Sequence, residues 1–206
     1  MITADIHKKL NAGGNETGLH IQLQANKGSI TVIHGPSGAG KTTFLKILAG
    51  LIVPEKGNIS VGGHIWLDTA SGINLSPQKR KAGFVFQHYA LFPNMTVRQH
   101  LEYATTDRQW IDQLLGIGGL TAFANRKPEH LSGGQQQRLA ILRAIAIKPA
   151  LLLMDEPFSA LDNKTKTALV TDLRKLWNEW QTTVIIVSHY PQELTRIATS
   201  ELYVES

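Results

Sequence analysis

The stretch Ser29–Thr43 reads SITVIHGPSGAGKTT and joins an apolar segment to a glycine-rich loop and a Lys-Thr pair. Ser29–Ile33 is almost continuously apolar, as expected for a central strand that leads into such a turn. In the loop, glycines let successive backbone N–H groups turn toward an anion. A helix is predicted to begin near Lys41, because apolar residues then recur at helical spacing, and its positive end faces the same anion.

The loop Gly35–Thr42 suits a nucleotide. Lys41 is placed to reach the β- and γ-phosphates, and Thr42 to offer its hydroxyl to Mg²⁺. A glycine-rich turn without a ligand is the structural alternative, but the strand before the loop and the helix after it favour binding. The candidate nucleotide-binding residues are Gly35, Pro36, Ser37, Gly38, Ala39, Gly40, Lys41, Thr42 and Thr43.

A second apolar run, Ala150–Met154, is followed by two carboxylates. Asp155 is costly to bury without a charged partner, and Mg²⁺ is the partner that we predict. Strand alternation is expected to aim Glu156 differently, so that it orients a water for attack on the γ-phosphate and takes its proton. A helix cap or a salt bridge is the alternative role for Glu156.

Asn58–Val61, Gly83–Phe86 and Thr183–Val187 are predicted as further strands, and Asp162 as the N-cap of a helix with an apolar stripe. Strands thus alternate with helices along the chain, which predicts an α/β fold: a P-loop NTPase core with a mainly parallel sheet. The N-terminal part is expected to add an antiparallel β subdomain, with His20–Gln24 as an edge strand. After Gln87 the strand signals disappear until about Ala146, which indicates an inserted α-helical subdomain. We therefore expect a single domain over residues 1–206, with 1–86 and 148–206 as the nucleotide-binding core and about 87–147 as the helical subdomain.

Composition excludes several classes of protein. The chain has no cysteine, which excludes disulfides, thiolate metal sites and cysteine nucleophiles. No apolar run is long enough to span a bilayer and the N-terminus does not resemble a signal peptide, so we expect a cytoplasmic protein. The net charge of +5 is compatible with nucleic acid or an anionic membrane surface, but the scattered Lys and Arg favour an ordinary, slightly basic surface.

The run Leu131–Arg138 reads LSGGQQQR and precedes a predicted helix over Gln135–Ile147. Its hydroxyl and open backbone N–H groups form a second helix start that suits an anion, although a simple Ser132 cap is the alternative. The order of phosphate loop, Ser-Gly-Gly loop and Asp155-Glu156 resembles the ABC family of ATPases. The run at Leu131 resembles the signature motif of that family.

The resemblance implies ATP and Mg²⁺ as cofactors and a head-to-tail homodimer that buries two ATP molecules. Each signature loop would cap the ATP of the other subunit, and Ser159–Asp162 resembles the D-loop along that interface. Without the resemblance, His189 would be interpreted as an ordinary core residue, and Gln87 would indicate no function. The resemblance implies that His189 contacts the γ-phosphate and that Gln87 senses Mg²⁺ and the attacking water. It implies Glu156, His189, Gln87 and Lys41 as catalytic residues, Thr42, Gln87 and Asp155 as Mg²⁺ contacts, and Ser132, Gly133, Gly134 and Gln135 as nucleotide contacts.

The segment Lys81–Leu101 resembles importer ATPases of the molybdate, sulfate, iron and polyamine type. Leu91, Phe92 and Pro93 then lie where such ATPases receive a helix of the permease; plain subdomain core is the alternative. Gly72–Pro77 is most similar to molybdate-type members. The resemblance implies the ATP-hydrolysing subunit of an ABC importer, at the cytoplasmic face of the membrane, for an oxyanion such as molybdate or sulfate.

The implied partners are transmembrane permease subunits and, indirectly, a solute-binding protein, with no nucleic acid. The sequence ends soon after His189 and leaves no room for the C-terminal regulatory domain of many such importers, so we expect either a minimal member or a trimmed sequence. An exporter ATPase or a soluble non-transport ABC ATPase is the alternative. Exporters often carry fused membrane spans, and repair-type members need a long coiled coil between the two motifs. A simple P-loop kinase would leave Ser132–Arg138 unexplained.

The sequence departs from the family pattern at the nucleobase. Many members stack adenine on an aromatic residue before the phosphate loop, whereas Met1–Lys27 contains no Phe, Tyr or Trp. Leu10 or His7 is the remaining candidate for a base platform. Weaker stacking predicts relaxed base selectivity, with GTP accepted beside ATP.

Overall fold

The computed structural model describes residues 1–12 and 15–205, whose strands form two five-stranded sheets. One sheet is parallel, in the order β10-β3-β9-β8-β7. The strands expected from the apolar runs at Ser29, Gly83, Ala150 and Thr183 are all present in it, whereas β10 was not predicted. Its strands are β3 (Ile30–His34), β7 (Gly83–Val85), β8 (Leu151–Asp155), β9 (Thr183–Val187) and β10 (Ser200–Tyr203).

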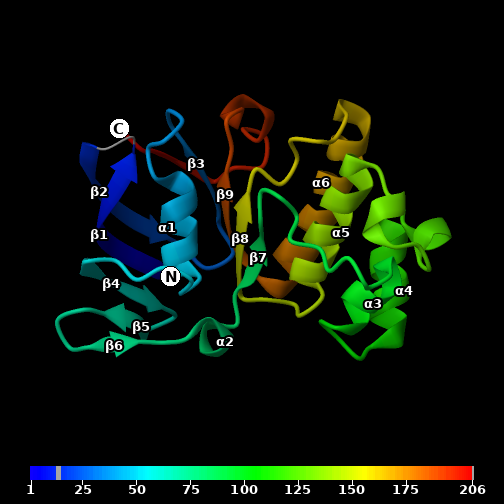
Figure 1. Cartoon of the computed structure of the whole chain (residues 1–206), viewed down its shortest axis with the longest axis horizontal. Helices are drawn as coiled ribbons and strands as arrows, with labels where there is room; N and C mark the ends of the chain where they lie inside the picture. The colour runs from blue at the N-terminus through cyan, green and yellow to red at the C-terminus, as the bar shows by residue number, and fades with distance from the viewer. Residues whose placement is uncertain (13–14, 206) are drawn as a thin grey trace.

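The parallel sheet is buried on both faces. In β8, Leu151 and Leu153 pack with α1 (Lys41–Leu48) and the antiparallel sheet, whereas Leu152 and Met154 face the opposite cluster. Figure 1 shows α1 between the β1–β2 hairpin and the parallel sheet, with α3, α4 and α5 on the far side. Because both faces are covered by apolar elements, the strands read as continuous apolar runs.

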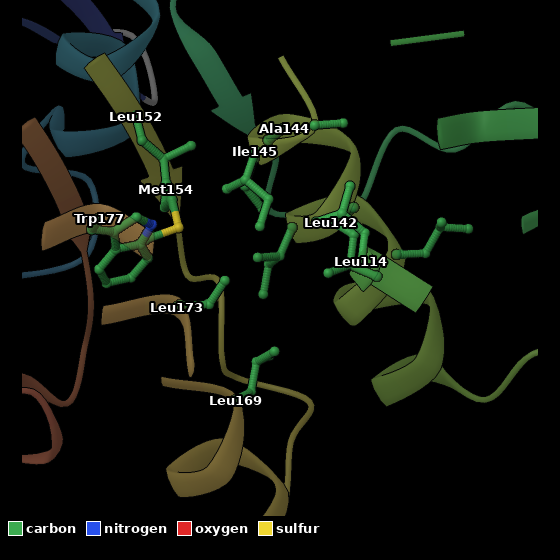
Figure 2. Close-up of a cluster of buried hydrophobic side chains, with 14 of the residues drawn as sticks. Leu114, Leu142, Ala144, Ile145, Leu152, Met154, Leu169, Leu173 and Trp177 are labelled. Carbon is green, nitrogen blue, oxygen red and sulfur yellow. The ribbon is translucent and has the colours of Figure 1, made fainter. Parts of the chain in front are cut away.

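The hydrophobic cluster that contains Leu152 and Met154 joins strand β8 to three helices. These are α4 (Arg108–Ile117), α5 (Gly133–Ile145) and α6 (Asn163–Trp180). Trp177 of α6 is only 1% exposed and belongs to this cluster together with Met154 (Figure 2). Burying one such side chain contributes about 1.5–3 kcal/mol. Asp162 caps α6 as predicted, since its carboxylate accepts a hydrogen bond from the Thr165 N–H at 3.0 Å.

The antiparallel sheet has the order β2-β1-β4-β5-β6, with β2 at the edge where the alternation at His20–Gln24 places it. Along β1, Ile2, Ala4 and Ile6 are buried while the residues between them face outward. We did not predict β1, β5 or β6. The strands are β1 (Ile2–Ala12), β2 (Asn15–Ala25), β4 (Lys56–Val61), β5 (His64–Asp68) and β6 (Ile73–Asn74).

A buried arginine joins the antiparallel sheet to the end of α1. Arg80, the last residue of α2 (Pro77–Arg80), donates hydrogen bonds to the carbonyl oxygens of Ile47 and Leu48 at 2.7 and 2.8 Å. These carbonyls lie in the last turn of α1, where intrahelical donors run out. Burial lowers the pKa of Arg80 to about 10, which still leaves the side chain charged at neutral pH.

The chain forms helices between β7 and β8, as the loss of strand signals predicted. Helix α3 (Val97–Glu102) begins at Thr96 with a capping box completed by Gln99. The other elements of this segment are α4, α5 and the short 3-10 helices at Thr121–Phe123 and Pro128–His130; a third 3-10 helix, Pro191–Glu193, follows β9. Over residues 1–12 and 15–205, no helix is both long and apolar enough to cross a bilayer.

His100 holds the loop before α3 in place. It is fully buried, and its Nε2 accepts a hydrogen bond from the Phe92 N–H at 2.9 Å, while Nδ1 lies 2.7 Å from the Thr96 carbonyl oxygen. This pattern requires the neutral ring with its proton on Nδ1. Burial lowers the pKa of His100, with a smaller contribution from the positive charge of Arg143.

We expect stability to decrease below pH 6.5 because of His100. The unfolded chain takes up this proton near pH 6.5 and the folded chain only at lower pH, so the unfolded state binds more protons between the two values. In urea titrations between pH 7.5 and 5.5, the free energy of unfolding should fall more steeply for the wild type than for His100→Leu. The difference should reach up to about 1.4 kcal/mol per pH unit; equal slopes would contradict the assignment.

Candidate functional site

The carboxyl ends of four neighbouring parallel strands meet at one edge of the sheet. The phosphate loop follows β3, Asp155 ends β8, His189 follows β9 and Gln87 follows β7. Clefts outside the carboxyl ends of such strands are where α/β sheets bind ligands. A cleft of about 490 Å³ lies there, lined by Lys8, Lys9, Leu10, Ser37, Gly38, Gly40, Lys41, Thr42, Thr43, Ile52, Gln87, Asp155, Glu156, Val187 and His189.

Glycine is required at two positions of the phosphate loop. Gly40 precedes α1 with φ +86°, and a Cβ there would lie 2.8 Å from Leu10 Cδ1 and 2.9 Å from Leu19 Cδ2. Gly35 has φ +146°, and its Cβ would collide with the carbonyl oxygen of Val204. The loop is therefore held closely between the β1–β2 hairpin and the segment after β10.

Lys41 is buried within its own loop, with 6% of its surface exposed. Its Nζ donates hydrogen bonds to the carbonyl oxygens of Gly35 and Pro36 at 2.8 and 2.7 Å. Burial lowers the pKa of Lys41, and the negative charges of Glu156 and Asp155 counteract part of that effect. The loop and Lys41 thus place a positive group at the base of the cleft, beside two carboxylates.

Thr42 and Asp155 connect the two predicted motifs directly. The Thr42 hydroxyl donates a hydrogen bond to Asp155 Oδ1 at 3.1 Å. Asp155 is 2% exposed; burial raises its pKa, while the Thr42 bond and the charges of Lys46, Lys41 and His189 oppose the rise. The pair offers two oxygen atoms to a hard cation, as predicted for these residues.

Glu156 has an unusual backbone for a residue with a side chain. Its φ is +49°, a region that such residues rarely adopt, and its N–H donates to the Val187 carbonyl oxygen at 3.0 Å. Strand β8 ends at Asp155, so Glu156 no longer follows the alternation of the strand. Its left-handed backbone conformation, rather than strand alternation, sets the direction of its side chain. Backbone strain of this kind persists where the surroundings enforce it, commonly at functional sites.

The Glu156 carboxylate is buried but incompletely bonded. Its Oε1 has no hydrogen-bond partner among the described residues, and His189 Nε2 lies 3.7 Å from it. Burial raises the pKa of Glu156, and the nearby His189 counteracts this in part. A carboxylate with a raised pKa and an available oxygen in a cleft is suited to accept a proton.

His189 and Gln87 both line the same cleft and are more accessible than Glu156. The His189 side chain is 45% exposed, so it is not the buried core residue that its position after a strand would suggest in isolation. The structure thus brings together Lys41, Thr42, Asp155, Glu156, Gln87 and His189, all of which were predicted.

The Ser-Gly-Gly loop does not line this cleft. Ser132 caps α5: its Oγ accepts from the Gln135 N–H at 3.3 Å and Gln135 Oε1 accepts from the Ser132 N–H at 2.9 Å. Gly134 packs closely on the loop after Glu156, since a Cβ there would lie 3.0 Å from the Ala160 carbonyl oxygen. Ser132 is therefore the N-cap of α5, as the alternative interpretation proposed. The predicted nucleotide contacts of Ser132–Gln135 stay a prediction.

Gln137 is a residue of the site that the sequence analysis missed. It is 1% exposed and donates to the Glu156 carbonyl oxygen at 2.9 Å and to Ser159 Oγ at 3.2 Å. Its Oε1 accepts from the Ala160 N–H at 2.9 Å. Helix α5 thereby fixes the backbone that carries Glu156. Gln137 stands within the polar run Gln135–Arg138, and nothing in that run distinguishes it from its neighbours.

The opposite wall of the cleft comes from the antiparallel sheet and the turn after α1. Lys8, Lys9, Leu10 and Ile52 line it, and of these only Leu10 was predicted. His7, the other candidate base platform, is not among the lining residues. Leu10 and Ile52 provide apolar contact, and relaxed base selectivity stays a prediction.

A family model described as "ABC transporter" matches residues 19–159. The molybdenum import ATP-binding protein ModC of Pseudomonas fluorescens is 39% identical, over 94% of this chain and 55% of that protein. The sulfate/thiosulfate import ATP-binding protein CysA of Mesostigma viride is 44% identical, over 87% of this chain and 52% of that protein. The chain thus spans about half the length of these relatives.

Among solved structures, the chain resembles an ATP-binding cassette in a dimeric, post-hydrolysis state bound to ADP and Pi. The TM-score is 0.84 and the sequence identity 32%, over 99% of this chain and 94% of that one. A second dimeric structure, of a bacterial ABC transporter cassette, matches equally well. The predicted fold class is confirmed.

We expect Gln137→Leu to lower the free energy of unfolding by about 1–3 kcal/mol. It leaves the Ala160 N–H without its acceptor and removes one donor from the Glu156 carbonyl, which keeps the bond from Ser159 Oγ at 3.1 Å. Urea titration of the purified chain measures this. The matched control is Gln113→Leu on the exposed face of α4, which should change stability little. Equal stability of the two variants would show that the Gln137 bonds do not hold this loop.

Proposed function

The chain belongs to the ABC transporter family, and we propose that it binds and hydrolyses ATP as the ATP-binding subunit of an importer. The observation that carries the proposal is the shared cleft at the edge of the parallel sheet. There the phosphate loop, Asp155, the partly unbonded Glu156 and His189 surround one space. A cleft with this donor set suits a polyphosphate at its base and a water molecule beside it.

The triphosphate is bound by the phosphate loop. Backbone N–H groups before α1 and the Lys41 ammonium neutralise its charge, and the positive end of α1 adds to the attraction. Lys41 exchanges its bonds to the Gly35 and Pro36 carbonyls for bonds to phosphate oxygens. Leu10 and Ile52 contact the base from the opposite wall.

Thr42 and Asp155 fit Mg²⁺. Their oxygen atoms lie 3.1 Å apart, close to the separation of about 2.9 Å expected for neighbouring ligands at 2.0–2.1 Å from an octahedral ion. Gln87 lines the cleft as a further oxygen donor. When bound, Mg²⁺ neutralises charge that develops on the β- and γ-phosphate oxygens.

Glu156 acts as the general base in this proposal. Its Oε1 accepts a hydrogen bond from the attacking water and then takes its proton, while His189 holds the γ-phosphate and the water in line. Burial raises the pKa of Glu156 toward the pH at which the protein works, and this makes the carboxylate a more effective base. Gln137 holds the Glu156 backbone from α5.

A head-to-tail homodimer completes each site. Ser132–Gln135 lie outside the cleft of their own chain, at a helix start that suits an anion. The similar cassettes were solved as dimers, one of them with ADP and Pi. Two copies would bury two ATP molecules, each held by Lys41 of one chain and Ser132 of the other, so ATP stabilises the closed dimer.

The importer assignment rests on the relatives and on one surface. The relatives are named for molybdenum and sulfate/thiosulfate import, which supports an oxyanion as the transported solute. An importer of this kind would receive the solute from a solute-binding protein outside the membrane. Phe92 is 39% exposed, and its ring lies 5.3 Å from that of the exposed Tyr103. We propose that a permease helix binds the surface formed by Phe92 and Tyr103. The chain would then lie at the cytoplasmic face of the membrane.

Glu156→Gln should bind ATP without hydrolysing it and accumulate as a dimer, because the amide cannot take the proton from water. Gel filtration with Mg-ATP and phosphate release measure the two effects. The control is Glu179→Gln, an exposed carboxylate on α6, which should hydrolyse ATP normally and stay monomeric. Normal turnover by Glu156→Gln would refute the base assignment.

Phe92→Ser should reduce co-purification of a multi-spanning permease from detergent-solubilised membranes, without changing basal ATP hydrolysis. Ile65→Ser, which alters another exposed apolar residue on β5, is the control and should retain the permease. ATP hydrolysis that nucleic acid stimulates, with no membrane partner recovered, would defeat the importer proposal and favour a soluble ABC ATPase.

A further inference from the structure

Three ligating side chains converge on the outer face of the β1–β2 hairpin. Asp5 and His7 alternate outward along β1, and His20 lies directly opposite His7 on β2. Over the described residues 1–12 and 15–205, they form one group of His and acidic side chains whose ligand atoms all lie within 4.8 Å of one another. These residues take no part in the nucleotide site.

The geometry of the group matches that of a small coordinated ion. Asp5 Oδ1 lies 2.9 Å from His20 Nε2 and 3.6 Å from His7 Nε2. With ligands at 2.0–2.2 Å, two donor atoms on a tetrahedral ion lie about 3.3 Å apart. The two imidazole rings are stacked, with centroids 3.9 Å apart and 11° between their planes, so both present Nε2 toward the same carboxylate oxygen.

A fourth residue holds the carboxylate in position. Gln22 Nε2 donates a hydrogen bond to Asp5 Oδ2 at 3.0 Å, which leaves Oδ1 toward the histidines. Outer partners of this kind orient ligands and tune metal affinity. The bonds from Gln22 and His20 lower the pKa of Asp5, so the carboxylate is ionised at neutral pH.

We propose that Asp5, His7 and His20 form a binding site for a divalent transition-metal ion, independent of the nucleotide cleft. Two imidazoles and one carboxylate favour Zn²⁺, Ni²⁺ or Cu²⁺ over Mg²⁺. The ion takes the place of the proton between His20 Nε2 and Asp5 Oδ1. A water molecule occupies the fourth coordination position of the ion. The ion joins β1 to β2 immediately before Lys8–Leu10, which line the cleft, and so stiffens the hairpin.

Isothermal titration of the untagged, nucleotide-free chain with ZnCl₂ at pH 7.5 tests the site. The wild type should bind one Zn²⁺. His7→Ala and His20→Ala should each weaken binding by more than the roughly tenfold or greater loss that is typical for removal of an outer partner such as Gln22. Gln22→Ala retains all three ligands and should weaken binding less. His64→Ala removes an exposed histidine of β5 in the same sheet and should leave the affinity unchanged.

Thermal unfolding gives a second measurement. Zn²⁺ should raise the Tm of the wild type and of His64→Ala but not of His7→Ala, because an ion that binds only the folded state stabilises it. The metal-free Tm should be similar in all variants, since the side chains of His7 and His20 are about half exposed. Absence of Zn²⁺ binding by the wild type, or equal binding by His7→Ala, His20→Ala and His64→Ala, would overturn the proposal.

Discussion

Parallel pairing of β3, β9, β8 and β7 is the constraint on which the rest of the structure depends. Parallel neighbours end at the same edge of the sheet, so the residues that follow them meet although they are far apart in sequence. The hydrogen bond from Thr42 to Asp155 joins residues 113 positions apart, at the end of this arrangement. Both faces of the sheet are packed against apolar elements. A one-residue change of register would move each side chain to the opposite face, which would disrupt both clusters and displace the site residues.

Helix α5 couples the rigid sheet to the loop that carries Glu156. Gln137 bonds to the Glu156 carbonyl, to Ser159 and to the Ala160 N–H, while the start of the same helix carries Ser132. A shift of α5 therefore alters the surroundings of the proposed base and the proposed intersubunit contact at once. The left-handed backbone of Glu156 makes this coupling sensitive, because its conformation depends on the bonds around it.

The sequence predicted those parts of the fold that leave a local pattern. The β3, β8 and β9 strands are apolar runs, and α6 has both a cap and an apolar stripe. Strand β10 was missed because it is short and mostly exposed, and β1 was missed although Ile2, Ala4 and Ile6 alternate. In the site, motif residues were predicted, whereas Gln137, Lys8 and Ile52 were not. Their roles arise from contacts between distant segments, which no local pattern encodes.

The close packing of Val204 against Gly35 has a mechanical consequence. Strand β10 lies at the edge of the parallel sheet, held on one side only by β3, and the Val204 N–H bonds to the His34 carbonyl directly before the loop. Tension applied beyond Val204 would peel this edge strand residue by residue. The force would reach the anion-binding loop before the central strands, so we expect a pull at this end to weaken nucleotide binding before the sheet itself unfolds.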